Sequence, residues 1–120
     1  MNIVLMTGRI VKDIETRMTT NGKKVLSNKI AVEDGYGEYK KTYFFNFVAW
    51  EHNANFLESY ATKGDKICIN GVLTEREYVN KEGNKQFVTE IIVSHVELMT
   101  RKHIDSGNRF AEIDDGDLPF

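Results

Sequence analysis

Apolar and polar side chains tend to alternate from residue 2 to residue 99, and β-branched and aromatic residues are frequent among them. This two-residue period is typical of half-buried β-strands. Turn residues interrupt the pattern at intervals. Between the turns it predicts five strands, at residues 2–9, 24–33, 39–50, 66–78 and 85–99. We therefore expect an all-β domain.

Short polar segments mark the connections between these strands. Asn21-Gly22 predicts a hairpin turn at residues 20–23, because both residue types tolerate the positive φ angles of a two-residue connection. Residues 34–38 place two glycines around Tyr36 and predict a flexible loop, and residues 80–84 predict a polar hairpin loop. Gly8 indicates a bulge or bend in the first strand.

The apolar period changes between residues 52 and 61, where one helical face collects Ala54, Phe56, Leu57, Tyr60 and Ala61. Thr62-Lys63-Gly64 would end this helix. A single short helix between the third and fourth of five strands describes the five-stranded OB-fold barrel. That barrel is the predicted fold.

The third predicted strand carries aromatic side chains on both faces. Alternation places Phe44, Asn46, Val48 and Trp50 on one face and Tyr43, Phe45, Phe47 and Ala49 on the other. Only one face can line the core, so the other needs a second apolar partner: a subunit, another element or nucleobases. Simple packing of both faces is the alternative. The same alternation puts Arg76 and Tyr78 together on one face of the fourth strand.

The formal net charge of −2 argues at first against a nucleic-acid ligand. The charge is uneven, however, because residues 105–120 carry −4 and residues 1–104 carry +2. Single-stranded nucleic acid requires rings that stack on bases and cations that meet phosphates. The candidates for phosphate contact are Arg17, Lys63 and Arg76. Charge alone does not establish DNA binding.

Enzymatic chemistry has little support in the sequence. The histidines His52, His95 and His103 are scattered, and Cys68 is the only cysteine, so we expect no metal site. No glycine loop that could cradle a phosphate is present, and we expect neither catalysis nor a cofactor. A lone cysteine agrees with a reducing compartment. Without a basic and apolar leader or a membrane-length apolar stretch, a chain of 120 residues is expected to be one cytoplasmic domain with a tail.

The end of the chain is its most specific feature, and it reads Asp114-Asp115-Gly116-Asp117-Leu118-Pro119-Phe120. Acids followed by Leu-Pro-Phe and a free carboxylate fit a basic pocket with a hydrophobic floor. A solubilising acidic tail is the alternative, but such a tail does not need a terminal aromatic residue. We predict a domain at residues 1–102, a polar linker at 103–113 and a protein-docking tip at 114–120.

Motifs along the whole chain resemble the bacterial-type single-stranded DNA-binding protein family, SSB. They are the opening Met-Asn-Ile-Val-Leu-Met-Thr-Gly, the terminal Asp-Asp-Gly-Asp-Leu-Pro-Phe and, in the expected order between them, Asn21-Gly22, Lys63-Gly64-Asp65 and Gly71-Val72-Leu73. The resemblance implies a homotetramer that binds single-stranded DNA independently of sequence in replication, recombination and repair. It also implies that the tip recruits partner proteins.

Site residues follow from the same resemblance. Phe44, Trp50 and Tyr78 occupy positions where the family stacks rings on bases, Tyr36 falls near another, and Arg17 and Arg76 match basic positions. The chain departs from the family in its much shorter linker, in Ile14 where a proline is usual, and in Gly116 among the acids of the tip. A phage-encoded or accessory member is one interpretation. The alternative function is an OB-fold adaptor or RNA-binding module that acts mainly through protein contacts.

Overall fold

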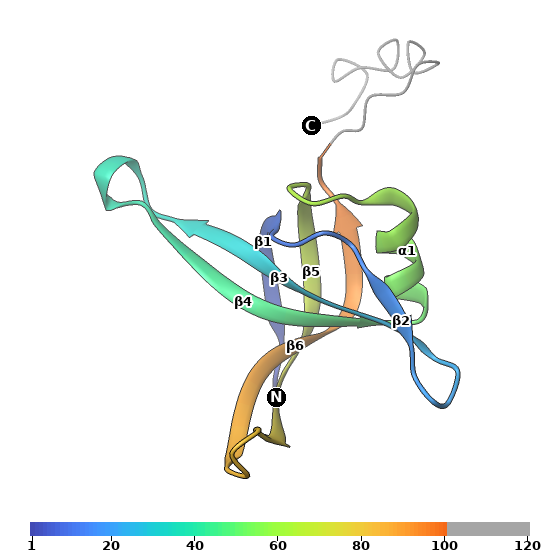
Figure 1. The fold of residues 1–120 in the computed structure, drawn as a ribbon. Helices are drawn as coiled ribbons and strands as arrows, with labels where there is room; N and C mark the ends of the chain where they lie inside the picture. Colours follow the sequence, from blue (N-terminus) through green and yellow to red (C-terminus); the bar gives the residue numbers. More distant parts are fainter. Residues whose placement is uncertain (101–120) are drawn as a thin grey trace.

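A computed structural model describes residues 1–100, which contain six strands, a short 3₁₀ turn and one α-helix (Figure 1). The elements in chain order are β1 (Val4–Ile10), β2 (Thr16–Met18), β3 (Lys24–Asp34), the 3₁₀ turn η1 (Gly37–Tyr39), β4 (Lys41–Trp50), α1 (His52–Tyr60), β5 (Lys66–Val79) and β6 (Lys85–Leu98). The five predicted strands correspond to β1, β3, β4, β5 and β6. The structure adds β2, which the alternation pattern did not predict as a separate strand.

One sheet closes on itself to form the barrel. Its strands follow the order β1-β5-β6-β4-β3-β2, and additional pairing of β1 with β3 at Arg9 and Ile10 completes the closure. At this crossing a side chain on Gly8 would overlap the carbonyl oxygen of Ala31 and approach Ile30 Cγ1 to 2.7 Å. Glycine is therefore needed at position 8 for the close approach of two backbones. The predicted OB-fold barrel with one short helix is confirmed.

The core lies inside this barrel and under the helix. Alternate residues of the long strands point inward, as the two-residue period requires. The largest fully buried side chains are Ile10, Val25, Leu26, Ile30, Phe47, Leu57, Ile67, Ile69 and Ile91. Helix α1 contributes Ala54 and Leu57 to the core and so covers one end of the barrel.

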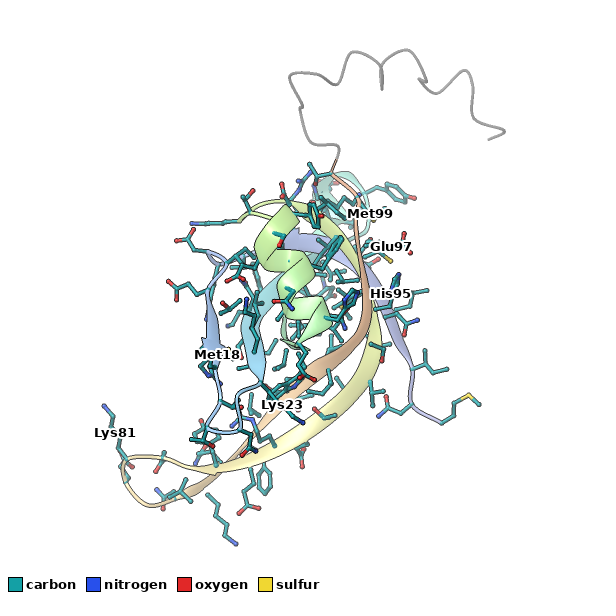
Figure 2. The ribbon with its side chains drawn as sticks, turned by 90° about the vertical axis from the view of Figure 1, so that its right-hand side faces the viewer. Met18, Lys23, Lys81, His95, Glu97 and Met99 are labelled. Atoms are coloured by element: carbon teal, nitrogen blue, oxygen red, sulfur yellow. The ribbon has the colours of Figure 1, made fainter. Side chains whose placement is uncertain are left out.

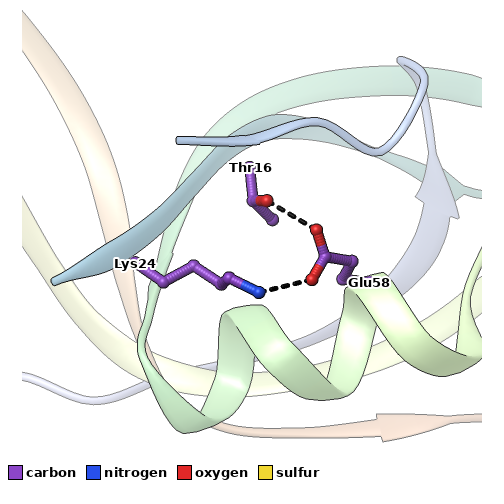
Figure 3. A network of polar contacts seen from close by, with 3 residues as sticks. All are labelled: Thr16, Lys24 and Glu58. Carbon is purple, nitrogen blue, oxygen red and sulfur yellow. Dashed lines mark hydrogen bonds and ion pairs between the residues drawn. The ribbon is translucent and has the colours of Figure 1, made fainter. Parts of the chain in front are cut away.

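Helix α1 is tied to the β2–β3 hairpin by the carboxylate of Glu58 (Figure 3). The hydroxyl of Thr16 in β2 donates to Glu58 Oε2 at 2.6 Å, and Lys24 Nζ in β3 donates to Glu58 Oε1 at 2.5 Å. The hydrogen bond from Lys24 lowers the pKa of Glu58, and the bond from Thr16 lowers it further. One helical carboxylate thereby fixes the position of both strands of the hairpin.

Two long hairpins extend beyond the barrel. The β3–β4 hairpin and the β5–β6 hairpin diverge from the point where β4 and β6 pair (Figure 1). Lys81 marks the tip of the β5–β6 hairpin, far from α1 (Figure 2). Aromatic side chains near the ends of both hairpins are consequently exposed to solvent, among them Tyr36, Tyr39, Phe44, Tyr78 and Phe87.

Candidate nucleic-acid interface

Strand register places the predicted stacking residues on one face of the sheet. In the parallel pair, Asn46 of β4 lies opposite Glu90 of β6, and in the antiparallel pair Glu90 lies opposite Thr74 of β5. Paired residues share a face, and every second residue returns to it. The face that carries Asn46 and Thr74 therefore also carries Phe44, Trp50, Arg76 and Tyr78, and we call it the aromatic face.

The rings of the aromatic face are accessible to a ligand. Phe44 is 59% exposed, Trp50 is 38% exposed and Tyr78 is 44% exposed. Tyr43 and Phe45 lie on the opposite face of the same strand, where their ring centroids are 6.4 Å apart in a stacked pair. The alternation predicted for this strand is thus present in the structure. Phe44 lies on one side of β4, and Tyr43 and Phe45 lie on the other, where they remain 44% and 39% exposed.

Arg17 extends the aromatic face beyond Trp50. Arg17 of β2 lies opposite Val25 of β3, which in turn lies opposite Trp50 of β4. The segment that leads into β2 is held by the buried side chain of Asn28, whose Oδ1 accepts from the Lys12 amide at 3.0 Å and whose Nδ2 donates to the Lys12 carbonyl at 3.0 Å. These bonds and the Glu58 contacts fix the strand on which Arg17 stands.

A hollow of about 410 Å³ lies beside Arg17, and its lining residues are Lys12, Asp13, Glu15, Thr16, Arg17 and Ser27. Sequence reasoning did not select Lys12 or Ser27. Ser27 lies opposite Val48 and is therefore on the aromatic face. The hollow mixes two cations with two carboxylates, so it is a polar margin of the face and not a strongly cationic site.

Arg76 occupies the middle of the aromatic face and is paired with an acid. Its Nε donates to Glu90 Oε1 at 3.0 Å, while the side chain of Arg76 is 60% exposed and that of Glu90 only 10% exposed. Sequence reasoning missed Glu90. A signal was available, because Glu90 is an acid immediately before the apolar run Ile91-Ile92-Val93.

The two remaining predicted site residues lie outside the centre of the face. Tyr36 is 90% exposed in the loop between β3 and β4, at the end of that hairpin. Lys63 lies in the turn just before β5, whereas Arg76 lies ten residues further along β5 than its first residue, Lys66. Those positions correspond to roughly 30 Å of strand. The structure therefore brings Arg17, Phe44, Trp50, Arg76 and Tyr78 onto one face and places Lys63 apart from Arg76 and Tyr78.

The chemistry available on the face is that of binding. Its exposed rings and guanidinium groups stand among small polar side chains such as Ser27, Asn46 and Thr74, and Arg76 engages the Glu90 carboxylate. Within residues 1–100, no three His, Cys, Asp or Glu side chains are grouped so that they could hold a metal ion. In the same residues, no helix has both the length and the apolar character to cross a membrane.

The predicted docking tip lies outside the described residues. Its members are Asp114, Asp115, Asp117, Leu118, Pro119 and Phe120. The predicted linker at residues 103–113 also lies outside that range. The tip therefore remains a prediction from sequence.

The fold and the site define a closed OB-fold barrel whose outer face carries exposed aromatic rings and arginines. The model of the single-strand binding protein family matches residues 1–99. The chain belongs to the single-strand binding protein family.

Curated relatives support the same family. The chain is 39% identical over 114 residues to a single-stranded DNA-binding protein of Malacoplasma penetrans, with 95% of this chain and 59% of that protein aligned. It is 30% identical over 137 aligned positions to single-stranded DNA-binding protein 3 of Streptococcus agalactiae, and the alignment covers 99% of each. Single-stranded DNA-binding protein 2 of Staphylococcus aureus is 34% identical over 86% of this chain and 76% of its own length. The chain thus spans well under two thirds of the Malacoplasma protein but nearly all of the streptococcal one.

Proposed function

We propose that this protein binds single-stranded DNA without sequence preference, through the aromatic face. The observation that carries the proposal is the register that gathers Phe44, Trp50, Arg76 and Tyr78 on one solvent-exposed side of the sheet. Membership of the single-strand binding protein family and the names of the relatives as single-stranded DNA-binding proteins support it.

Stacking accounts for binding by a domain with little net positive charge. Each base that stacks on a ring contributes about 1 to 3 kcal/mol, and every base offers a similar flat surface. Arg17 and Arg76 then meet phosphates as the strand passes the rings, which makes the affinity depend on salt. Tyr36 extends the path along the β3–β4 hairpin, and Lys63 serves as a more distant phosphate contact.

Competition among three ligands tests this proposal against its alternatives. A labelled single-stranded oligothymidine is bound, and unlabelled single-stranded DNA, duplex DNA and RNA of matched length are added as competitors. Displacement by single-stranded DNA at far lower concentration than by the others is expected. Equal or better displacement by RNA would favour an RNA-binding module. Failure of all three nucleic acids to bind would favour an adaptor that acts through protein contacts.

We propose further that the protein is a homo-oligomer, and a tetramer on the family resemblance. Among the described residues, β1 pairs with β3 only at Arg9 and Ile10, so the rest of that edge of β1 has no strand partner. Next to it, Ile3 is 70% exposed and Leu5 is 71% exposed. An open edge flanked by apolar side chains suits addition of another strand. Light scattering should give four chains for the wild type and fewer for Leu5→Glu; a monomeric wild type would contradict the proposal.

Residues 114–120 are proposed to recruit other proteins to the DNA during replication, recombination and repair. The sequence of acids followed by Leu118-Pro119-Phe120 supports this role. Deleting residues 118–120 should leave single-stranded DNA binding intact or slightly tighter and abolish pull-down of replication and repair enzymes from extract. Retained pull-down would contradict the docking role. The setting proposed is the bacterial cytoplasm or nucleoid, or the host cytoplasm for a phage-encoded member, with no catalytic activity of its own.

A further inference from the structure

Glu90 is an unexpected residue on a face that meets phosphates. It is only 8% exposed, and it lies on β6 between the two strands that carry Phe44 and Tyr78. A carboxylate there repels a polyanion, and taking it out of water is costly unless a partner compensates. Its compensating partner is Arg76, whose Nε donates to Oε1 at 3.0 Å. This ion pair therefore helps to set the direction in which the Arg76 guanidinium faces a ligand.

Register shows in which direction the pair draws Arg76. Arg76 lies opposite Val88, whereas Glu90 lies opposite Thr74, so the ion pair runs diagonally from β5 to β6. Tyr78 stands two residues from Arg76 on the same face, in the direction opposite to Thr74. The contact thus draws the guanidinium toward β4 and away from the Tyr78 ring. Without Glu90, the guanidinium could lie over that ring as a cation–π pair and cover it.

The contact uses only one of the donors of Arg76. A guanidinium has five N–H groups, and Nε supplies one of them. Among the described residues, the terminal nitrogens of Arg76 have no other hydrogen-bond partner, and 60% of the side chain is exposed. Four N–H groups therefore remain for a phosphate, in the geometry that favours two parallel bonds.

We propose that Glu90 is a positioning residue for DNA binding: it holds Arg76 by Nε, directs its terminal N–H groups to phosphate and keeps the Tyr78 ring open to a base. This inference rests on the proposed function, and it goes further by assigning a role to an acid that electrostatics alone would count against binding.

A double-mutant cycle separates positioning from charge. If Glu90 acts only as a negative charge, both Glu90→Gln and Glu90→Leu tighten binding to an oligothymidine, because each removes repulsion. If Glu90 positions Arg76, Glu90→Leu weakens binding about fivefold to tenfold, as expected for a lost charge-assisted phosphate contact. Glu90→Gln keeps an acceptor oxygen for Nε and should bind within about twofold of the wild type or more tightly.

The cycle is completed in the Arg76→Ala background, where Glu90 has no guanidinium to position. There Glu90→Leu should no longer weaken binding, and the release of repulsion should leave it unchanged or tighter. In the otherwise native chain, Glu90→Leu should also reduce the slope of log affinity against log salt by about 0.7, the share of one phosphate contact on a single strand. Glu75→Leu, a matched control on the opposite face of β5, should change neither quantity.

Arg76→Lys gives a second test that leaves the buried acid in place. A lysine ammonium engaged by Glu90 lacks the separate terminal nitrogens of arginine, so its affinity should fall to nearly that of Arg76→Ala although the charge is kept. Wild-type affinity for Arg76→Lys would overturn the inference even if Glu90→Leu failed to fold. If the wild type binds and Glu90→Leu weakens binding equally in the Arg76→Ala background, the positioning role of Glu90 is overturned but the proposed function is not. No binding by the wild type would overturn the proposed function as well.

Discussion

Replacing Phe44 by alanine should weaken single-stranded DNA binding far more than replacing its neighbour Phe45. Phe44 is 59% exposed on the aromatic face, whereas Phe45 is 39% exposed on the opposite face and stacks with Tyr43. Loss of one stacked base costs about 1 to 3 kcal/mol, which corresponds to roughly a 5- to 150-fold loss of affinity for Phe44→Ala. Phe45→Ala should change affinity by less than about threefold.

Stability should follow the reverse order, which makes the pair a matched control. Phe45 buries more of its ring than Phe44, so Phe45→Ala should lower the melting temperature more. Fluorescence anisotropy of a labelled oligothymidine measures the affinity, and thermal unfolding followed by circular dichroism measures the stability. Equal losses of affinity for two folded variants would refute the assignment of Phe44 and its face to DNA.

Three predictions concern the scaffold that presents this face. Lys24 holds the pKa of Glu58 below its ordinary value of 4.5, so Glu58 stabilises the fold fully above that value and loses this contribution as pH falls through the lowered pKa. Urea midpoints of wild type and Glu58→Gln should therefore differ at neutral pH and converge as the pH is lowered through that pKa. A difference that stays constant with pH would contradict the role of the charge. Glu51 has a φ angle of 46° at the corner between β4 and α1, a conformation that is strained for any residue except glycine. Glu51→Gly should relieve this strain and stabilise the protein in urea unfolding by about 1 kcal/mol, after the entropic cost of glycine is subtracted. A lower urea midpoint for Glu51→Gly would contradict this account. Gly8→Ala should destabilise the protein by about 1 to 3 kcal/mol, because β1 and β3 cross closely at Gly8. As a control, Thr7→Ala at the exposed neighbouring position should change the stability by less than about 0.5 kcal/mol. Equal urea midpoints for the two variants would argue against the close approach.

The barrel and its aromatic face were largely predictable because a strand has a short, regular period. Alternation alone put Phe44 and Trp50 on one side of β4, and Arg76 and Tyr78 on one side of β5. It could not show that the two sides belong to one continuous face, since that depends on the parallel pairing of β4 with β6. The family resemblance implied a stacking role for residues on both strands, but it did not place the two sides next to each other.

Other features depend on contacts between distant parts of the chain. The strand β2 has three residues, Thr16–Met18, which is too short for alternation to be recognised. The contact of Glu90 with Arg76 requires the register of β5 and β6, which contains an irregularity between Asn70 and Gly71. The predicted phosphate contact Lys63 could be selected by residue type but not placed relative to the face.

Trp50 provides the most direct measurement of the central claim. It is the only tryptophan of the chain, it lies on the aromatic face, and it is 38% exposed. Single-stranded oligonucleotide should quench its fluorescence to saturation, and the affinity should fall linearly with salt on logarithmic axes. Unchanged fluorescence, together with no complex detected by gel shift, would contradict binding of single-stranded DNA at this face.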